Sequence, residues 1–442
     1  MQFAPHTDDD VQEMLAACGR SSIEDLYAHL PPDVVLGRDL DLAEGLSELA
    51  LTREMRELAA RNRNADGYVC FAGGGAYDHY VPAVVWAMAG RSEFYTSYTP
   101  YQPELSQGVL QALFEYQSMI CELTGLEVSN ASLYDGATAL VEAVHMAVAA
   151  TGRRRILLSE AADPRFWEAL RTYGRGAGYE PEPIPAAGGV SEATEVRDDV
   201  AAVVVQHPNV FGNLEPASAL FESAHAADAR AIQIFDPLSV GTLAPPGELG
   251  ADIAVAEGQV LGNHLNYGGP YLGIVAARMA DVRRMPGRIV GETVDVDGRS
   301  GYVLTLQARE QHIRREKATS NICTNQTLMA VAATVYLAWL GPAGLAELAR
   351  QCHAKAAYAA DALDALPGVE LAFPGVPFFK EFALRTTREA LDVQRDVLDQ
   401  GYLVGPIVPH EGRPALLVSV TERRNRDEID GLVDAMKTAA AS

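Results

Sequence analysis

The sequence predicts an α/β protein with a large, mostly parallel sheet and a smaller C-terminal α/β domain. Short, continuously apolar segments alternate with stretches of helical periodicity in the middle of the chain. Strands without polar alternation are typical of parallel sheets that helices cover on both faces. The strands expected in the large sheet are Arg155 to Ser159, Ala201 to Val205, Ala231 to Phe235 and Ile253 to Val255, with Tyr271 to Ala277 as a candidate antiparallel strand.

The 442 residues are expected to fold in three regions. Residues 1–65 are predicted to form a helical arm, because helix-capping patterns recur in them. Residues 66–325 are assigned to the large domain, and residues 326–442 to a linking helix and the small domain. The stretch 304–339 is expected to be largely helical. A glycine loop, Phe71 to Tyr80, is interpreted as a tight turn without a preceding strand.

The composition excludes several classes of partner. A net charge of −24 would repel nucleic acid and anionic membranes. The five cysteines are far apart, lack the spacing of a metal site and predict reduced thiols. The first residues lack the apolar core of a signal peptide, and no apolar run approaches the roughly 20 residues that span a bilayer. We therefore expect a cytoplasmic protein without a bound metal.

One predicted strand, Ala231 to Phe235, ends in an acidic residue, Asp236. A second short strand and a glycine turn, Gly268 to Pro270, follow it. This order resembles the pyridoxal-phosphate-dependent transferase fold of the aspartate-aminotransferase-like type, fold type I. In that fold the Asp pairs with the pyridinium nitrogen, and a lysine after the later strand forms the Schiff base. Here the lysine position holds Gln259, and the first 316 residues contain no lysine.

Other residues of a vestigial cofactor pocket can be proposed from the same layout. Asp135, Gly136 and Thr138 open a helix where the fold places its phosphate site, although Asp135 brings a negative charge and is also a common helix cap. Asn209 lies in a loop after a strand, where parallel sheets bind ligands. Asp236 could equally cap the turn at Pro237.

A segment rich in tyrosine precedes a long amphipathic helix. Its side chains do not follow the apolar stripe of that helix, so a role in the core explains them poorly. A loop of Tyr, Thr and Pro is more often a contact surface. The candidates for an active site at a subunit interface are Tyr95, Tyr98, Thr99, Tyr101 and Gln102.

Several longer motifs make the chain similar to the glycine cleavage system P-protein, and specifically to the alpha chain, subunit 1, of its two-subunit form. They extend from the glycine loop to beyond residue 320. The matching motifs are FAGGGAYDHYVPAVV (from Phe71), EFYTSYTPYQPELSQG (from Glu93), YDGATALVEAV (from Tyr134), HPNVFG, GGPYLG, MPGRIVGETVD (from Met285) and REKATSNICTNQ (from Arg315).

The resemblance implies a glycine dehydrogenase (decarboxylating) that works as a complex of two kinds of chain and is inactive as this chain alone. A lysine of the beta subunit would hold the pyridoxal phosphate. Glycine would be decarboxylated through an aldimine of that cofactor, with release of CO₂. The aminomethyl group would pass to the lipoyl arm of the H-protein. An α2β2 heterotetramer is expected, and Gln259 agrees with an alpha chain that lacks the lysine.

Two other classes of function remain open from the sequence. A self-sufficient pyridoxal-phosphate enzyme, such as an aminotransferase or desulfurase, needs a lysine in the pocket, and Lys317 lies too far along the chain for the usual position. A scaffold or regulatory pseudoenzyme of the same fold would need no catalytic residue at all.

Overall fold

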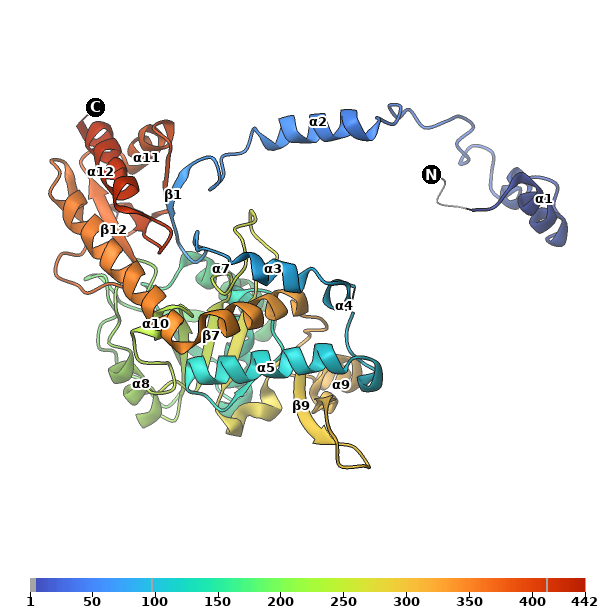
Figure 1. Ribbon diagram of the computed structural model, residues 1–442. Helices are drawn as coiled ribbons and strands as arrows, with labels where there is room; N and C mark the ends of the chain where they lie inside the picture. Colours follow the sequence, from blue (N-terminus) through green and yellow to red (C-terminus); the bar gives the residue numbers. More distant parts are fainter. Residues whose placement is uncertain (1–4, 97, 411, 442) are drawn as a thin grey trace. The chain divides into compact units, whose positions relative to one another are not determined.

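The computed structural model describes residues 5–96, 98–410 and 412–441 (Figure 1). The chain divides into two compact units, one up to Arg63 and one from Asn64 onward. The first unit contains helix α1 (Asp8–Ala17), a 3-10 turn (Glu24–Tyr27) and helix α2 (Glu48–Ala59). Thr7 caps α1 by accepting a hydrogen bond from the N–H of Asp10.

The second unit is built on a large, mostly parallel sheet, as the sequence predicted, and this sheet has seven strands. The strand order is β2-β8-β7-β6-β5-β3-β4. Neighbouring strands from β7 to β4 are parallel, and β8 is antiparallel to both of its neighbours. The strands are β2 (Val128–Ser129), β3 (Arg155–Ser159), β4 (Pro181–Ile184), β5 (Val200–His207), β6 (Arg230–Phe235), β7 (Ile253–Glu257) and β8 (Gly273–Ala277).

Helices cover both faces of this sheet, which explains why its central strands consist mainly of apolar residues. On β7, Ala254 and Ala256 pack in the cluster formed by α5 (Gln107–Thr124) and α10 (Thr327–Asp364). Ile253 and Val255 point the other way, toward α6 (Gly136–Thr151). Successive side chains of a strand face opposite sides, so each face receives alternate residues. Figure 1 shows α5 and α10 together on one face. Helices α7 (Pro164–Ala177) and α8 (Ala217–Ala226) complete the cover.

The stretch expected to be helical from residue 304 is helical only in its second part. An antiparallel hairpin of β9 (Ile289–Val294) and β10 (Ser300–Thr305) comes first, and the one-turn helix α9 (Gln311–Arg314) follows it. The long helix α10 then runs to Asp364 and is interrupted at Gly341, which precedes Pro342. By length and composition α10 could cross a membrane, contrary to the expectation from sequence. Half of its most apolar window is buried, as in a core helix.

The C-terminal part forms a four-stranded sheet with the order β11-β12-β15-β14. Helices α11 (Ala390–Asp399) and α12 (Arg426–Ala441) pack against it. A further strand, β1 (Val69–Ala72), pairs in parallel with β13 (Tyr402–Gly405). The glycine loop therefore does follow a strand, which corrects the expectation from sequence. The sheet strands are β11 (Val369–Leu371), β12 (Glu381–Thr386), β14 (Ile407–Val408) and β15 (Ala415–Ser419).

Candidate functional site

A cavity of about 380 Å³ lies at the carboxyl ends of β5, β6 and β7. This is the edge at which parallel sheets bind ligands. The glycine loop before α3 (Ala83–Ala89), the first residues of α6 and the start of β12 close its sides. Of the residues proposed from sequence, Asp135, Gly136, Asn209 and Asp236 line this cavity. Gln259 and Thr138 lie in direct contact with residues of the lining.

Two carboxylates occupy the N-terminus of α6, where a phosphate would bind. Asp135 caps the helix, because its Oδ1 accepts a hydrogen bond of 2.8 Å from the N–H of Thr138. Glu257 Oε2 accepts from the N–H of Gly136 at 3.1 Å. Burial raises the pKa of Glu257 to about 7, against the effect of the backbone N–H groups of Leu272, Gly136 and Gln259 that it accepts from. The N–H groups that would hold a phosphate therefore already have acidic partners.

Gln259, at the position of the missing lysine, is buried and fully used in hydrogen bonds. Its Oε1 accepts from the N–H of Tyr77 at 2.9 Å. Its Nε2 donates to the carbonyl oxygens of Tyr77, at 3.1 Å, and Asn263, at 2.7 Å. The side chain therefore fixes the glycine loop to the turn after β7. An amide cannot form an imine, so Gln259 acts here as a connector.

Asp236 has a partner that the sequence did not reveal. Its Oδ1 accepts from the N–H of Leu238 at 2.9 Å, which is the capping role foreseen as an alternative. Its Oδ2 lies 2.6 Å from Nζ of Lys380, and the Lys380 side chain is buried. No lysine was expected in this pocket from the sequence. Lys380 nevertheless enters it, from the segment before β12.

Lys380 belongs to a buried chain of hydrogen bonds. Its Nζ lies 3.1 Å from His79 Nε2 and 3.8 Å from the ring centroid of Tyr77. An ammonium only donates, so Nε2 accepts and Nδ1 carries the proton that His79 shares with Glu422 Oε2 at 2.6 Å. Burial opposes ionisation of Glu422, but the hydrogen bonds from His79 and from the N–H of Tyr80 lower its pKa. The chain links β6, the glycine loop and the C-terminal sheet.

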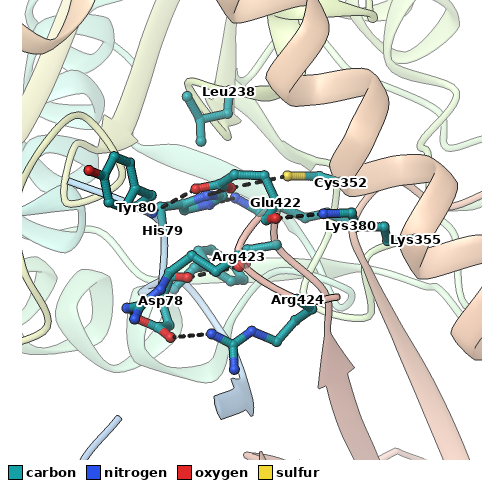
Figure 2. Close-up of polar contacts among 12 residues, drawn as sticks. Asp78, His79, Tyr80, Leu238, Cys352, Lys355, Lys380, Glu422, Arg423 and Arg424 are labelled. Carbon is teal, nitrogen blue, oxygen red and sulfur yellow. Dashed lines mark hydrogen bonds and ion pairs between the residues drawn. The ribbon is translucent and has the colours of Figure 1, made fainter. Parts of the chain in front are cut away.

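The same region contains one group of residues with the chemistry of metal ligands. The ligand atoms of His79, Cys352 and Glu422 lie within 4.8 Å of one another. Figure 2 shows His79, Cys352 and Lys355 gathered around Glu422. Burial raises the pKa of the Cys352 thiol, and the ammonium of Lys380 adjoins His79. Protonated sulfur and a neighbouring cation both oppose a metal ion. The group is better explained as hydrogen bonding.

Asn209 lines the cavity, but its amide stabilises the loop that carries it. Its Nδ2 donates to Glu215 Oε1 at 2.6 Å and to the carbonyl oxygen of Gly189 at 2.9 Å. Its Oδ1 accepts from the N–H groups of Phe211 and Asn213. Both N–H groups of the Asn209 amide thus donate to the protein itself and are not available to a ligand.

The tyrosine segment lies elsewhere. Of the residues that the structure describes, none from this segment lines the cavity. Tyr98 is 80% exposed, and Tyr95 and Gln102 are also exposed. Tyr101 is anchored: the buried Arg288 donates to its hydroxyl at 2.8 Å, and the guanidinium lies 5.3 Å from the ring centroid. Thr99 accepts a backbone hydrogen bond from Tyr101 at 2.8 Å. One ring fixes the segment while the others face outward.

The comparisons with known proteins decide the family. The family model described as "Glycine cleavage system P-protein" matches residues 1–436. The chain belongs to this family. It is 52% identical to the probable glycine dehydrogenase (decarboxylating) subunit 1 of Moorella thermoacetica and 51% identical to that of Carboxydothermus hydrogenoformans, with 99% of each chain covered in both cases.

Solved structures show that this P-protein family member has the predicted fold. A crystal structure of glycine decarboxylase (P-protein) of the glycine cleavage system, in inhibitor-bound form, is 47% identical, with a TM-score of 0.94 over 99% of this chain and 100% of the other. A sphingosine-1-phosphate lyase from Burkholderia pseudomallei shares the fold at 16% identity, with a TM-score of 0.66 over 92% and 93% of the chains. The fold is the pyridoxal-phosphate-dependent transferase fold, fold type I.

The pocket of this P-protein chain does not fit pyridoxal phosphate, although its fold does. The amide of Gln259 offers no nucleophile, and Asp236 already holds an ammonium group. Glu257 would face the phosphate with a carboxyl group. Each part of the site is present in the fold, and each is satisfied by a side chain of the protein itself.

Proposed function

We propose that this chain is the alpha subunit of a two-subunit glycine decarboxylase of the glycine cleavage system. With a beta subunit it decarboxylates glycine, releases CO₂ and transfers the aminomethyl group to the lipoyl arm of the H-protein. The observation that carries the proposal is the full-length correspondence, at about half identity, to relatives named subunit 1. A regulatory or scaffold role has no comparable support.

The two kinds of chain divide the work. The beta subunit holds pyridoxal phosphate on a lysine, and the cofactor stabilises the negative charge that develops at the substrate carbon. This chain supplies one wall of a shared site. The assembly is an α2β2 heterotetramer, since chains of this fold place their active sites near the interface of a pair and obligate interfaces are large. We place this assembly in the cytoplasm. The cavity described above is what remains of a cofactor site in this chain, and its ligand-binding groups are already paired with Lys380 and Glu257.

The location of the cofactor tests this division directly. The assembled complex is treated with pyridoxal phosphate and borohydride, and peptides from both chains are analysed by mass spectrometry. We expect a pyridoxyl group on a lysine of the beta subunit. We expect none on Lys380 of this chain, because its ammonium is buried against Asp236. A stoichiometric adduct on Lys380 would favour the self-sufficient enzyme instead.

The tyrosine segment is the contribution to the shared site that we propose for this chain. Tyr95, Tyr98, Thr99, Tyr101 and Gln102 offer hydroxyl and amide groups that can orient the glycine carboxylate or the lipoyl arm. Tyr101 is held by Arg288, and the exposed Tyr98 and Gln102 lie close to this anchor in the sequence. Presenting groups from a fixed loop lowers the entropy cost of binding.

Variants of two exposed residues check this contribution. Tyr98→Phe or Gln102→Ala is expected to lower turnover of the complex at least about tenfold, or about 1.4 kcal/mol of barrier, because positioning is lost. The complex should stay assembled and equally heat-stable. Tyr173→Phe, on α7, is the matched control, since Tyr173 is also partly exposed but lies outside the segment. Unchanged turnover in both variants, or dissociation of the complex, would reduce the segment to interface packing.

A further inference from the structure

The pocket of this chain contains two side chains that occupy the partners a cofactor of this fold would need. The first is the ammonium of Lys380, 2.6 Å from Asp236 Oδ2. The second is the carboxyl group of Glu257, 3.1 Å from the N–H of Gly136 at the start of α6. Both residues line the cavity, one at each end of the place where a cofactor would lie. The missing lysine at position 259 is therefore only one of three differences.

Lys380 has the same electrostatic relation to Asp236 as a protonated ring nitrogen. Each is a cation that donates to the carboxylate. Both oxygens of Asp236 already have partners, because the N–H of Leu238 donates to Oδ1 and Lys380 to Oδ2. Lys380 is also held from two other sides, by His79 Nε2 and by the face of the Tyr77 ring. A ring nitrogen would have to displace a buried ammonium from all three partners, which opposes its binding.

Glu257 acts at the opposite end. Its two oxygens accept from the N–H groups of Gly136, Leu272 and Gln259, so it is fixed in place by the backbone. A phosphate group approaching α6 would meet this carboxyl group and that of Asp135 where other members of the fold offer N–H groups. These two carboxyl groups already accept from the N–H groups of Gly136 and Thr138, so those donors are not available to a phosphate.

We propose that Lys380 fills, in this chain, the place of the cofactor's ring nitrogen on Asp236, and that Lys380 and Glu257 together exclude pyridoxal phosphate even when a lysine is present at position 259. The ion pair of Lys380 and Asp236 thus connects the C-terminal sheet to the large sheet without a ligand. This inference rests on the proposed division of work between the two subunits and explains it at the level of this chain.

The test uses the full-length chain with a lysine restored. Gln259→Lys is compared with Gln259→Lys/Lys380→Met and with the control Gln259→Lys/Lys355→Met, since Lys355 is bonded to the carbonyl oxygen of Glu422 and does not contact Asp236. Each protein is incubated with pyridoxal or with pyridoxal phosphate and reduced with borohydride. The pyridoxyl group on residue 259 is then quantified by peptide mass spectrometry. Lys380→Gln provides a second form of the double variant if the methionine form does not fold.

We expect the single variant and the Lys355 control to form little adduct with either aldehyde. The variant without Lys380 should form about tenfold more with pyridoxal. It should take pyridoxal at least as well as pyridoxal phosphate, because Glu257 still opposes the phosphate. A stoichiometric adduct of pyridoxal phosphate on Gln259→Lys alone would overturn the inference, and so would equal pyridoxal labelling with and without Lys380. Neither result would affect the proposed function of the native two-subunit complex, which a decarboxylation assay judges separately.

Discussion

Replacing Lys380 with methionine is expected to lower the free energy of unfolding of this chain by about 3 kcal/mol. Removing one partner of a buried ion pair leaves the other charge without compensation, and here it also removes the donor to His79. Asp236 lines the cavity and its side chain is 14% exposed, which places the loss at the lower end of the range for buried pairs. Urea unfolding of the full-length chain measures it.

Two further variants separate this loss from lost packing. Lys437→Met changes an exposed lysine of α12 and should alter stability by less than about 0.5 kcal/mol. Lys380→Met/Asp236→Asn removes both charges and should recover most of the stability, because a neutral amide leaves no unpaired carboxylate. A single variant as stable as the native chain, or a double variant less stable than the single one, would show that the ion pair of Lys380 and Asp236 does not stabilise the fold.

The pattern of the large sheet could be predicted from sequence because its cause is local. Burial on both faces requires apolar residues at consecutive positions, and the runs at β5 and β6 show this directly. The cap at Asp135 follows the same principle, since a carboxylate before a helix leaves a pattern within four residues. Gln259 could be placed by its distance from the glycine turn.

Elements without a local pattern were missed. Strand β4, with the sequence PEPI, has two prolines and a glutamate and pairs only because it lies at the edge beside β3. The β9–β10 hairpin was not predicted either, because the expected helix was begun at residue 304, which lies inside β10. Both depend on tertiary neighbours more than on propensity.

The contact that decides the state of the pocket lay beyond sequence reasoning. Lys380 and His79 are 301 positions apart, and no local pattern joins them. A signal did exist: Lys380 and Glu381 interrupt the aromatic run Phe378, Phe379 and Phe382. A charged pair in such a run is expected to have buried partners. The sequence could have raised the question, but only the fold shows that the partner is Asp236.

We propose that glycine decarboxylation needs both kinds of chain. In the pocket of this chain, the groups that would bind a cofactor are already paired with the chain's own side chains, and Tyr95 and Tyr98 of the tyrosine segment are exposed. Each subunit alone should therefore lack a complete site. This chain lacks the cofactor, and the beta subunit lacks the groups that position the substrate. Positioning effects of this kind are large, and we expect the combined activity to exceed that of either chain alone on the order of 100-fold or more.

The most direct measurement is the release of labelled CO₂ from carboxyl-labelled glycine in the presence of lipoylated H-protein and pyridoxal phosphate. The assay is run with this chain alone, with the beta subunit alone, and with both at equal total protein. We expect background release from each chain alone and strong release from the mixture. Full activity of the beta subunit without this chain, or of this chain without the beta subunit, would contradict it.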